Sequence, residues 1–212
     1  MVRRKLMGLL VCTLALSLAS FAWAGVPDLG FSTLSGAMEP VQVSVYSLPN
    51  GAGHGLDDVY VLGGVKVNAT VTVTLLDSNL QPVFNYPFED LWVDSSLGGI
   101  VYCPGGTTAD ANTDANGQTT FTNALFAGLS SDPLATEGLV VMVSGVPMSR
   151  TLPYHFNSPD MDGDLIVNLT DVVIFAGIYY GAYEYKADFY WDLTINLSDI
   201  VLLAQGMGAE CP

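Results

Sequence analysis

Residues 160–171 read DMDGDLIVNLTD, and residues 188–199 read DFYWDLTINLSD. The two stretches align without gaps, and aspartate or asparagine recurs at positions 1, 5, 9 and 12 of both. A similar apolar run follows each stretch, VVIFA from residue 172 and IVLLA from residue 200. A single acidic turn is common at protein surfaces, but two copies in fixed register indicate an internal duplication.

The spacing of the oxygen-bearing residues fits a calcium-binding loop. Calcium takes six to eight oxygen ligands, and a 12-residue loop supplies them from positions 1, 3, 5, 7, 9 and 12. We therefore expect one or two Ca²⁺ ions. The expected ligands of the first loop are Asp160, Asp162, Asp164, the backbone carbonyl of Ile166, Asn168 (directly or through water) and Asp171. Those of the second loop are Asp188, Asp192, the carbonyl of Thr194, Asn196 and Asp199.

Two features distinguish these loops from the usual calcium loop. Position 6 normally carries glycine because the backbone turns there with positive φ, but here it carries Leu165 and Leu193. Position 3 of the second loop is Tyr190, which removes one carboxylate, so the first loop should bind more tightly. Position 8, Val167 or Ile195, suits a short β-bridge between the loops, and a helix should begin just before the carboxylate at position 12.

The chain before residue 157 shows the pattern of a β structure. Short alternating or apolar runs are separated by Asn, Asp, Gly and Pro, without a long helical pattern between them. This arrangement predicts an antiparallel β-sandwich. The clearest expected strands are 41–45, 71–75, 91–93, 100–102, 119–122 and 139–143, and the weaker ones are 83–86 and 151–156.

Residues 71–83 (VTVTLLDSNLQPV) and 113–122 (TDANGQTTFT) resemble the bacterial immunoglobulin-like domains of surface adhesins. In those domains a strand ending in a D-x-x-G-x-P-V turn precedes a T-D-x-x-G hairpin. Leu80 stands where the first turn usually has glycine. Asn116-Gly117 is expected to form a two-residue hairpin with positive φ.

The duplicated loop-then-helix arrangement resembles the type I dockerin, a pair of F-hands. The resemblance implies a non-catalytic, calcium-folded module that docks onto a protein partner such as a cohesin. Positions 10 and 11, often Ser-Thr in cellulosomal dockerins, are Leu169-Thr170 and Leu197-Ser198 here, so the partner is either cohesin-like or a second copy of this chain. The expected fold is therefore mainly β, with a signal peptide at 1–24, an immunoglobulin-like sandwich at 25–156 and a small α-helical dockerin-like calcium domain at 157–212.

The start of the chain, 1–24, has the form of a secretory signal, with a basic beginning, an apolar core and the small-x-small sequence Ala22-Trp-Ala24. We expect a secreted or cell-surface bacterial protein without a membrane span. The remaining chain keeps three basic residues against 21 acidic ones (3 − 21 = −18). This charge disfavours nucleic acid and anionic membranes and attracts cations.

Cys103 and Cys211 remain after the signal, and an even pair in an exported protein favours a disulfide; two separate thiols are the alternative. Enzymatic activity is not expected, because no nucleophile elbow, zincin helix or phosphate loop is present. Glu89 and Asp90 are adjacent on an expected strand and should point to opposite faces. His54, near Asp57 and Asp58, is interpreted as a loop histidine, with a metal site as the alternative.

A cluster of aromatic residues lies between the two loops: Tyr179, Tyr180, Tyr183, Tyr185, Tyr190 and Trp191. We expect it to pack between the two domains, with a sugar-stacking face as the alternative. The expected function is calcium-stabilised protein–protein attachment or assembly. Two alternatives stay open: a carbohydrate-binding accessory module in polysaccharide catabolism, and a self-assembling subunit of an extracellular fibre or surface layer.

Overall fold

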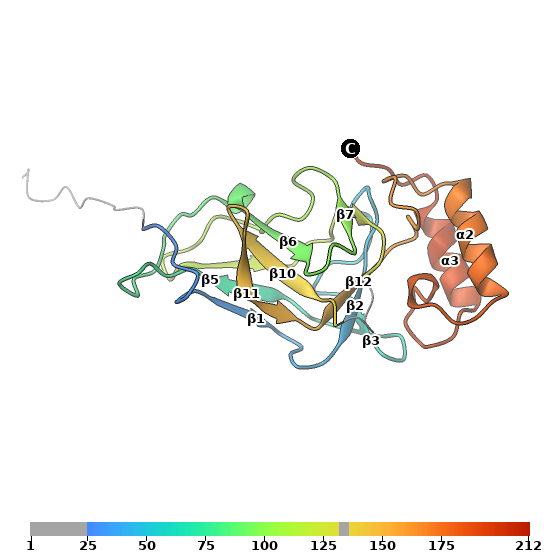
Figure 1. Ribbon diagram of the computed structural model, residues 1–212, viewed down its shortest axis with the longest axis horizontal. Helices are drawn as coiled ribbons and strands as arrows, with labels where there is room; N and C mark the ends of the chain where they lie inside the picture. Colours follow the sequence, from blue (N-terminus) through green and yellow to red (C-terminus); the bar gives the residue numbers. More distant parts are fainter. Residues whose placement is uncertain (1–24, 132–135) are drawn as a thin grey trace, which may run out of the picture.

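The computed structural model describes residues 25–131 and 136–212 (Figure 1). The signal peptide expected at residues 1–24 lies outside these ranges. The described chain is mainly β, and its helices follow the strands in sequence. Within the described ranges, no helix has the length and apolar character needed to cross a membrane.

Two three-stranded antiparallel sheets contain most of the strands expected from alternation. Their strand orders are β1 (Thr33–Gly36), β5 (Val71–Thr74), β8 (Gln118–Phe121), and β11 (Val146–Leu152), β10 (Leu139–Val143), β6 (Leu91–Ser95). Along β5 and β6, buried residues alternate with partly exposed ones, as expected for strands with one face against a core. A third pair, β7 (Val101–Tyr102) with β9 (Ala127–Gly128), is also antiparallel.

A four-stranded sheet departs from the expected all-antiparallel arrangement. Its order is β12 (Tyr154–Asn157), β2 (Val43–Tyr46), β3 (Val59–Val61), β4 (Val65–Val67), and β12 pairs with β2 in parallel. The expected strand 151–156 is divided at Pro153, which separates β11 from β12. Proline has no N–H to donate to a ladder, so the chain leaves one sheet there and joins another.

The main core lies between these sheets. Its largest fully buried side chains include Phe121, Tyr154 and Phe156, which come from β8 and β12. The remaining core is rich in valine and leucine, the residues that suit a half-buried pleated surface. We call residues 25–157 the β region. Because β12 is its last strand and is buried in this core, the chain that follows starts from a fixed position.

Two tight turns of the β region share one design. The Asp77 carboxylate accepts bonds from the backbone N–H groups of Asn79 and Gln81, and Asp114 does the same for Asn116 and Gln118. The fourth residue of each turn has positive φ: 61° at Leu80 and 72° at Gly117. The two-residue hairpin expected at Asn116-Gly117 is therefore wrong, since the turn runs from Asp114 to Gln118 and only its glycine has positive φ.

The expected strand at 83–86 is also absent, because the chain turns there, with Asn85 at φ 58°. Hydrogen bonds to Thr113 take the place of a β-ladder. The Tyr86 N–H donates to the Thr113 hydroxyl, and the Asn85 N–H donates to the Thr113 carbonyl. Positive φ at a non-glycine residue interrupts a strand, so an apolar pattern alone is not sufficient at this place.

The helical region, residues 158–212, contains α2 (Leu169–Tyr179) and α3 (Leu197–Gly206), with a 3₁₀ turn, η4 (Tyr185–Ala187), between them. Both helices begin where the duplicated pattern predicts. Val173 of α2 belongs to the apolar run that follows the first loop, but its side chain is 72% exposed. Phe175, further along the same helix, is buried instead and stacks on Phe189, with ring centroids 5.8 Å apart.

The β region and the helical region share a second buried cluster. Tyr46, Leu48 and Tyr60 of the β region pack in it with apolar residues from α2, α3 and the second loop. The Tyr46 hydroxyl donates to the Leu202 carbonyl at 2.8 Å, and the Asn157 amide donates to two backbone carbonyls of the helical region. The β region and the helical region, which meet near the expected boundary at residues 156–157, therefore share a buried interface.

Candidate metal centre

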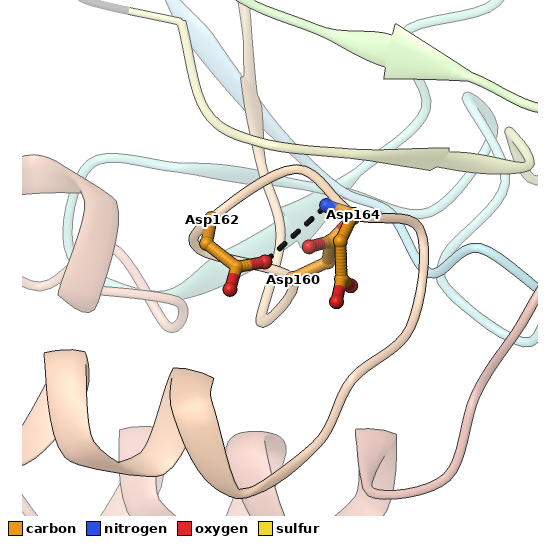
Figure 2. Close-up of side chains that lie close together, drawn as sticks. All are labelled: Asp160, Asp162 and Asp164. Carbon is orange, nitrogen blue, oxygen red and sulfur yellow. Dashed lines mark hydrogen bonds between the residues drawn. The ribbon is translucent and has the colours of Figure 1, made fainter.

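The first loop follows β12 closely and brings three carboxylates together. Asp160, Asp162 and Asp164 each place an oxygen within 4.8 Å of the others (Figure 2). Asp160 is fully buried, whereas Asp162 and Asp164 are exposed. In the described ranges no other three His, Cys, Asp or Glu side chains gather in this way. The cluster contains three of the six ligands expected for this loop.

Backbone N–H groups hold these carboxylates in place. Asp160 accepts from Gly163 at 2.9 Å and from Leu165 at 3.0 Å, one bond to each oxygen. Asp162 accepts from the Asp164 N–H, and Asp164 accepts from the Ile166 N–H at 2.9 Å. Each side chain thus folds back on the loop that carries it. This arrangement gathers the oxygen ligands that a hard cation requires.

Asn168 and Asp171, two of the expected ligands, cap the start of α2. The Asn168 side-chain oxygen accepts from the Thr170 N–H at 2.7 Å, so its amide nitrogen faces Asp164 and the Ile166 carbonyl. Asp171 is fully buried, and its two oxygens accept from the N–H groups of Met161 and Asn168 at 2.7 and 2.8 Å. Asp171 is not part of the three-carboxylate cluster; it ties the start of the loop to the start of α2.

The second loop forms a closely related network with one shift: one donor to its position-1 carboxylate is the position-5 N–H of Asp192, where the first loop uses the position-4 N–H of Gly163. Asp188 accepts from Asp192 and Leu193, and Asp192 accepts from Thr194. Asp199 accepts from Tyr190 and Asn196, as Asp171 does from Asp162 and Asn168. The Asn196 side chain caps α3 and also lies against Asp192 and the Thr194 carbonyl. The duplicated sequence therefore produces a duplicated backbone fold, including the ligand positions.

Tyr190 stands where the first loop has Asp162, so the second loop has no carboxylate at position 3. Its ring lies 5.1 Å from the ring of Tyr60, and a Cβ added to Gly64 would overlap it. The aromatic side chain thus packs against β3 and its turn to β4. Position 3 of this loop contributes to the contact with the β region, and Asp188, Asp192 and Asp199 remain as the available carboxylates.

Positive φ recurs at positions 4 and 6 of both loops. The values are 77° at Gly163 and 66° at Leu165, and 50° at Trp191 and 65° at Leu193. Three of these four residues carry side chains that disfavour the left-handed region by about 1–2 kcal/mol each. The chain tolerates this conformation because it directs several N–H groups at the buried carboxylates of Asp160 and Asp188.

Relief of this strain gives a testable result. We expect Leu165→Gly to raise the free energy of unfolding by about 0.5–1 kcal/mol, since glycine adopts positive φ without the Cβ clash but loses more chain entropy on folding. Urea unfolding measures the change. Val173→Gly, at an exposed position inside α2, is the matched control and should lower stability by about 0.5–1 kcal/mol. A loss at Leu165 as large as that at Val173 would contradict the strain at position 6.

Burial gives these loops an electrostatic cost. It raises the pKa of Asp160 to about 6, with the carboxylates of Asp171 and Asp164 acting in the same direction and backbone N–H bonds opposing it. Burial also raises the pKa of Asp188 and of Asp199. A charged carboxylate away from water is unfavourable unless a partner of opposite charge is present. The donor set of each loop, hard oxygen atoms without nitrogen or sulfur, fits calcium as that partner.

The first loop is also fixed by the β region. The Leu129 N–H donates to the Asp160 carbonyl at 2.8 Å, and a Cβ at Gly128 would overlap the Asp160 carboxylate. Gly128 therefore allows the buried loop to approach β9. Nothing in the sequence pattern near residue 128 predicted this contact, since the two segments are distant in sequence.

The expected bridge between the loops is wrong. Val167 instead exchanges backbone hydrogen bonds with the C-terminal segment, donating to Ala209 at 2.9 Å and accepting from Gly208 at 2.8 Å, and Ile166 is bridged to Glu210. Cys211 follows directly and is joined to Cys103 by a disulfide, with Cα atoms 5.8 Å apart. The predicted disulfide is thus present, and it holds the segment that pairs with the first loop.

The other candidates from sequence lie apart from this centre. His54 packs between the rings of Tyr46 and Tyr60, at 5.2 and 5.1 Å, and burial lowers its pKa. Glu89 and Asp90 belong to a short 3₁₀ turn, η2 (Phe88–Asp90), and not to a strand as expected; both are exposed. Of the aromatic cluster, Tyr185, Tyr190 and Trp191 pack against the β region, while Tyr179, Tyr180 and Tyr183 are exposed.

Compared with protein families, curated proteins and solved structures, the chain matches none of them. The geometry of the two loops and the surfaces around them is therefore the basis for assigning a function.

Proposed function

We propose that this chain is a non-catalytic, exported bacterial protein in which a calcium-stabilised, dockerin-like module follows an immunoglobulin-like β domain and attaches the protein to a protein partner. The observation that carries the proposal is the repeated network of the two loops. The segments 160–171 and 188–199 fold alike, accept strained backbone angles, and bury the carboxylates at their first and last positions. The turns at Asp77 and Asp114 bond a carboxylate to backbone N–H groups in a similar way, but among the described residues three carboxylates gather only in the first loop.

Calcium bound in each loop would neutralise carboxylates that the fold brings together. In the first loop Asp160, Asp162 and Asp164 would hold the ion with the Ile166 carbonyl, and in the second Asp188 and Asp192 would hold it with the Thr194 carbonyl. The protein's part is to fix the loop ends: Asp171 and Asp199 join each loop to the helix that follows it. The first loop, with its third carboxylate, should bind more tightly.

The helices that follow the loops expose matching apolar side chains. Leu169 and its equivalent Leu197 are 73% and 69% exposed, and Val173 and its equivalent Val201 are 72% and 45% exposed. Residues spaced by four lie on one face of a helix, so each pair forms a stripe. Figure 1 shows both helices at the end of the molecule beyond β12 and β2.

Exposed apolar stripes of this kind support a docking role. Apolar side chains on a polar, strongly acidic surface are unfavourable in water and commonly mark a protein–protein contact. Calcium would act on this face indirectly, because each ligand loop ends in the first turn of the helix that carries a stripe. The disulfide supports an exported location, since disulfides persist in oxidising compartments.

Photo-crosslinking tests the docking face. A photoreactive phenylalanine at position 173 is expected to form a defined adduct in calcium, with a cell-envelope or secreted protein of the source organism or with a second copy of the chain. The adduct should disappear in chelator. Position 65 on β4, where Val65 is 59% exposed, is the matched control and should give none. Equal yields at both positions, or no adduct at position 173 in calcium, would refute the docking face.

A further inference from the structure

A cleft of about 540 Å³ opens where the β region meets the helical region, away from the exposed stripes of α2 and α3. The β region contributes Gln42, Leu62 and Ser130 to its lining, and the helical region contributes Tyr183 and Trp191, among others. Its volume falls within the range of small-molecule sites, about 300–1,000 Å³. The proposed docking function does not use this cleft.

The aromatic lining of the cleft is held rigidly. The Tyr185 hydroxyl is hydrogen-bonded to the Ser44 hydroxyl at 2.8 Å, and its ring meets the Trp191 ring edge-on at 6.2 Å. The Trp191 carbonyl accepts from the Gly63 N–H at 2.9 Å, which fixes the tryptophan to the turn between β3 and β4. Because Trp191 is only 5% exposed and Tyr185 only partly exposed, these two rings form a fixed wall, and Tyr183 offers the accessible aromatic face. A preformed wall binds a ligand without first losing side-chain freedom.

The mouth of the cleft exposes apolar surface. Tyr183 is 45% exposed, and its hydroxyl donates to Asp188 at 2.8 Å, so its ring is restrained by the second loop. Leu62 and Leu193 line the same cleft, each 56% exposed. Three apolar side chains around one opening favour a ligand with an apolar face.

The polar groups of the cleft have no net charge. Glu184 and Lys186 line it and form an ion pair at 3.1 Å, so that their charges offset each other. Gln42 is exposed at the rim and has both a donor and an acceptor in its side chain. Ser130 adds a hydroxyl that bonds to Asn157 at 2.9 Å. Such groups suit neutral hydroxyls better than a formal charge.

We propose that this cleft binds a neutral saccharide, one or two units of an oligosaccharide chain. A pyranose ring has an apolar C–H face that packs on aromatic rings and a rim of hydroxyls that exchange hydrogen bonds with amides and hydroxyls. The mature chain carries a net charge of −18 (3 − 21), which disfavours anionic ligands. The site is distinct from the exposed helical stripes, so one chain can hold a glycan and a protein partner together.

Titration with neutral hexasaccharides tests the proposal. β-1,4-linked hexamers of glucose, xylose and mannose are added to the full mature chain in about 2 mM calcium, with calorimetry and tryptophan fluorescence as readouts. At least one hexamer should bind saturably below about 1 mM, and Gln42→Ala and Tyr183→Ala should each weaken it about tenfold. Tyr180→Ala, at a residue 88% exposed that does not line the cleft, is the control and should leave the affinity unchanged.

Three outcomes would overturn the proposal: no saturable binding of any hexamer up to about 10 mM, an affinity unaffected by Gln42→Ala and Tyr183→Ala, or tighter binding of an anionic galacturonate hexamer. Because Gln42 is exposed, its variant should fold, and circular dichroism checks this. Failure here would leave the calcium-dependent adduct at position 173 intact, so that the two proposals are separately testable.

Discussion

Withdrawing calcium is expected to lower the melting temperature of the chain by about 5–10 °C, and Asp160→Asn should remove most of this difference. An ion that binds only the folded state stabilises it by RT ln(1 + [Ca]/Kd), about 2.7 kcal/mol at a hundredfold excess over Kd. Asp160 is the fully buried carboxylate of the cluster, so replacing it with the isosteric amide removes the charge that calcium would pair with. Calorimetric melting in chelator and in calcium measures the effect.

Asp188→Asn provides the matched comparison, because Asp188 holds the same position in the second loop and likewise accepts two backbone N–H bonds, from Asp192 and Leu193. Its loss should reduce the calcium-dependent shift less than Asp160→Asn does, since Tyr190 leaves that loop with fewer carboxylates. Asp114→Asn, in a turn of the β region, should lower stability equally with and without calcium. A chain that melts at the same temperature in chelator and in millimolar calcium would exclude the calcium-folded module.

Sequence periodicity predicted the parts of the fold whose side chains alternate strongly. β5 and β10 lie where apolar residues recur in strand patterns, and the starts of α2 and α3 lie where a capping asparagine precedes an aspartate. The disulfide was expected from the two cysteines that lie beyond the expected signal at residues 1–24. These features depend on local composition or on a simple count, so one sequence suffices to find them.

Other elements are too short or depend on distant partners. β1, β3, β4 and β9 have two to four residues each, and none of them lies in a five-residue alternating run such as the one at 71–75 that marks β5. The parallel pairing of β12 with β2 joins segments from opposite ends of the β region, and the sequence around Pro153 marks the break between strands without naming the new neighbour. Contacts such as that of Gly128 with Asp160 depend on this long-range arrangement.

In the candidate site, the sequence predicted which carboxylates come together better than it predicted the role of each residue. The clustering of Asp160, Asp162 and Asp164 was expected, and so was positive φ at Leu165. The oxygens of Asp171 are bonded to backbone N–H groups, and the same residue types serve as helix caps and as calcium ligands. Spacing alone cannot separate these two roles.

Removing the disulfide should have the largest effect on stability. Cys103 and Cys211 are 108 residues apart in sequence, and closing a loop of that length is worth about 4–5 kcal/mol in the chain-entropy account. We expect the double variant Cys103→Ser, Cys211→Ser to unfold at a melting temperature about 8–15 °C lower than the oxidised chain. Oxidised chain treated with reductant is the matched control and should behave like the variant.

Removing the disulfide should also affect the first loop, residues 160–171. Cys211 follows the segment whose Gly208 and Ala209 exchange backbone hydrogen bonds with Val167, and the Ile166 carbonyl one residue earlier is an expected ligand. Releasing this segment removes the support on that side of the loop, so calcium affinity in the double variant should fall several-fold as measured by calorimetry. Adding Asp188→Asn to the double variant should suppress calcium binding by the second loop. The remaining heat of calcium binding then reports the first loop alone. An unchanged melting temperature in the double variant would contradict this prediction. It would show that the C-terminal segment stays bound to the rest of the chain without the covalent link.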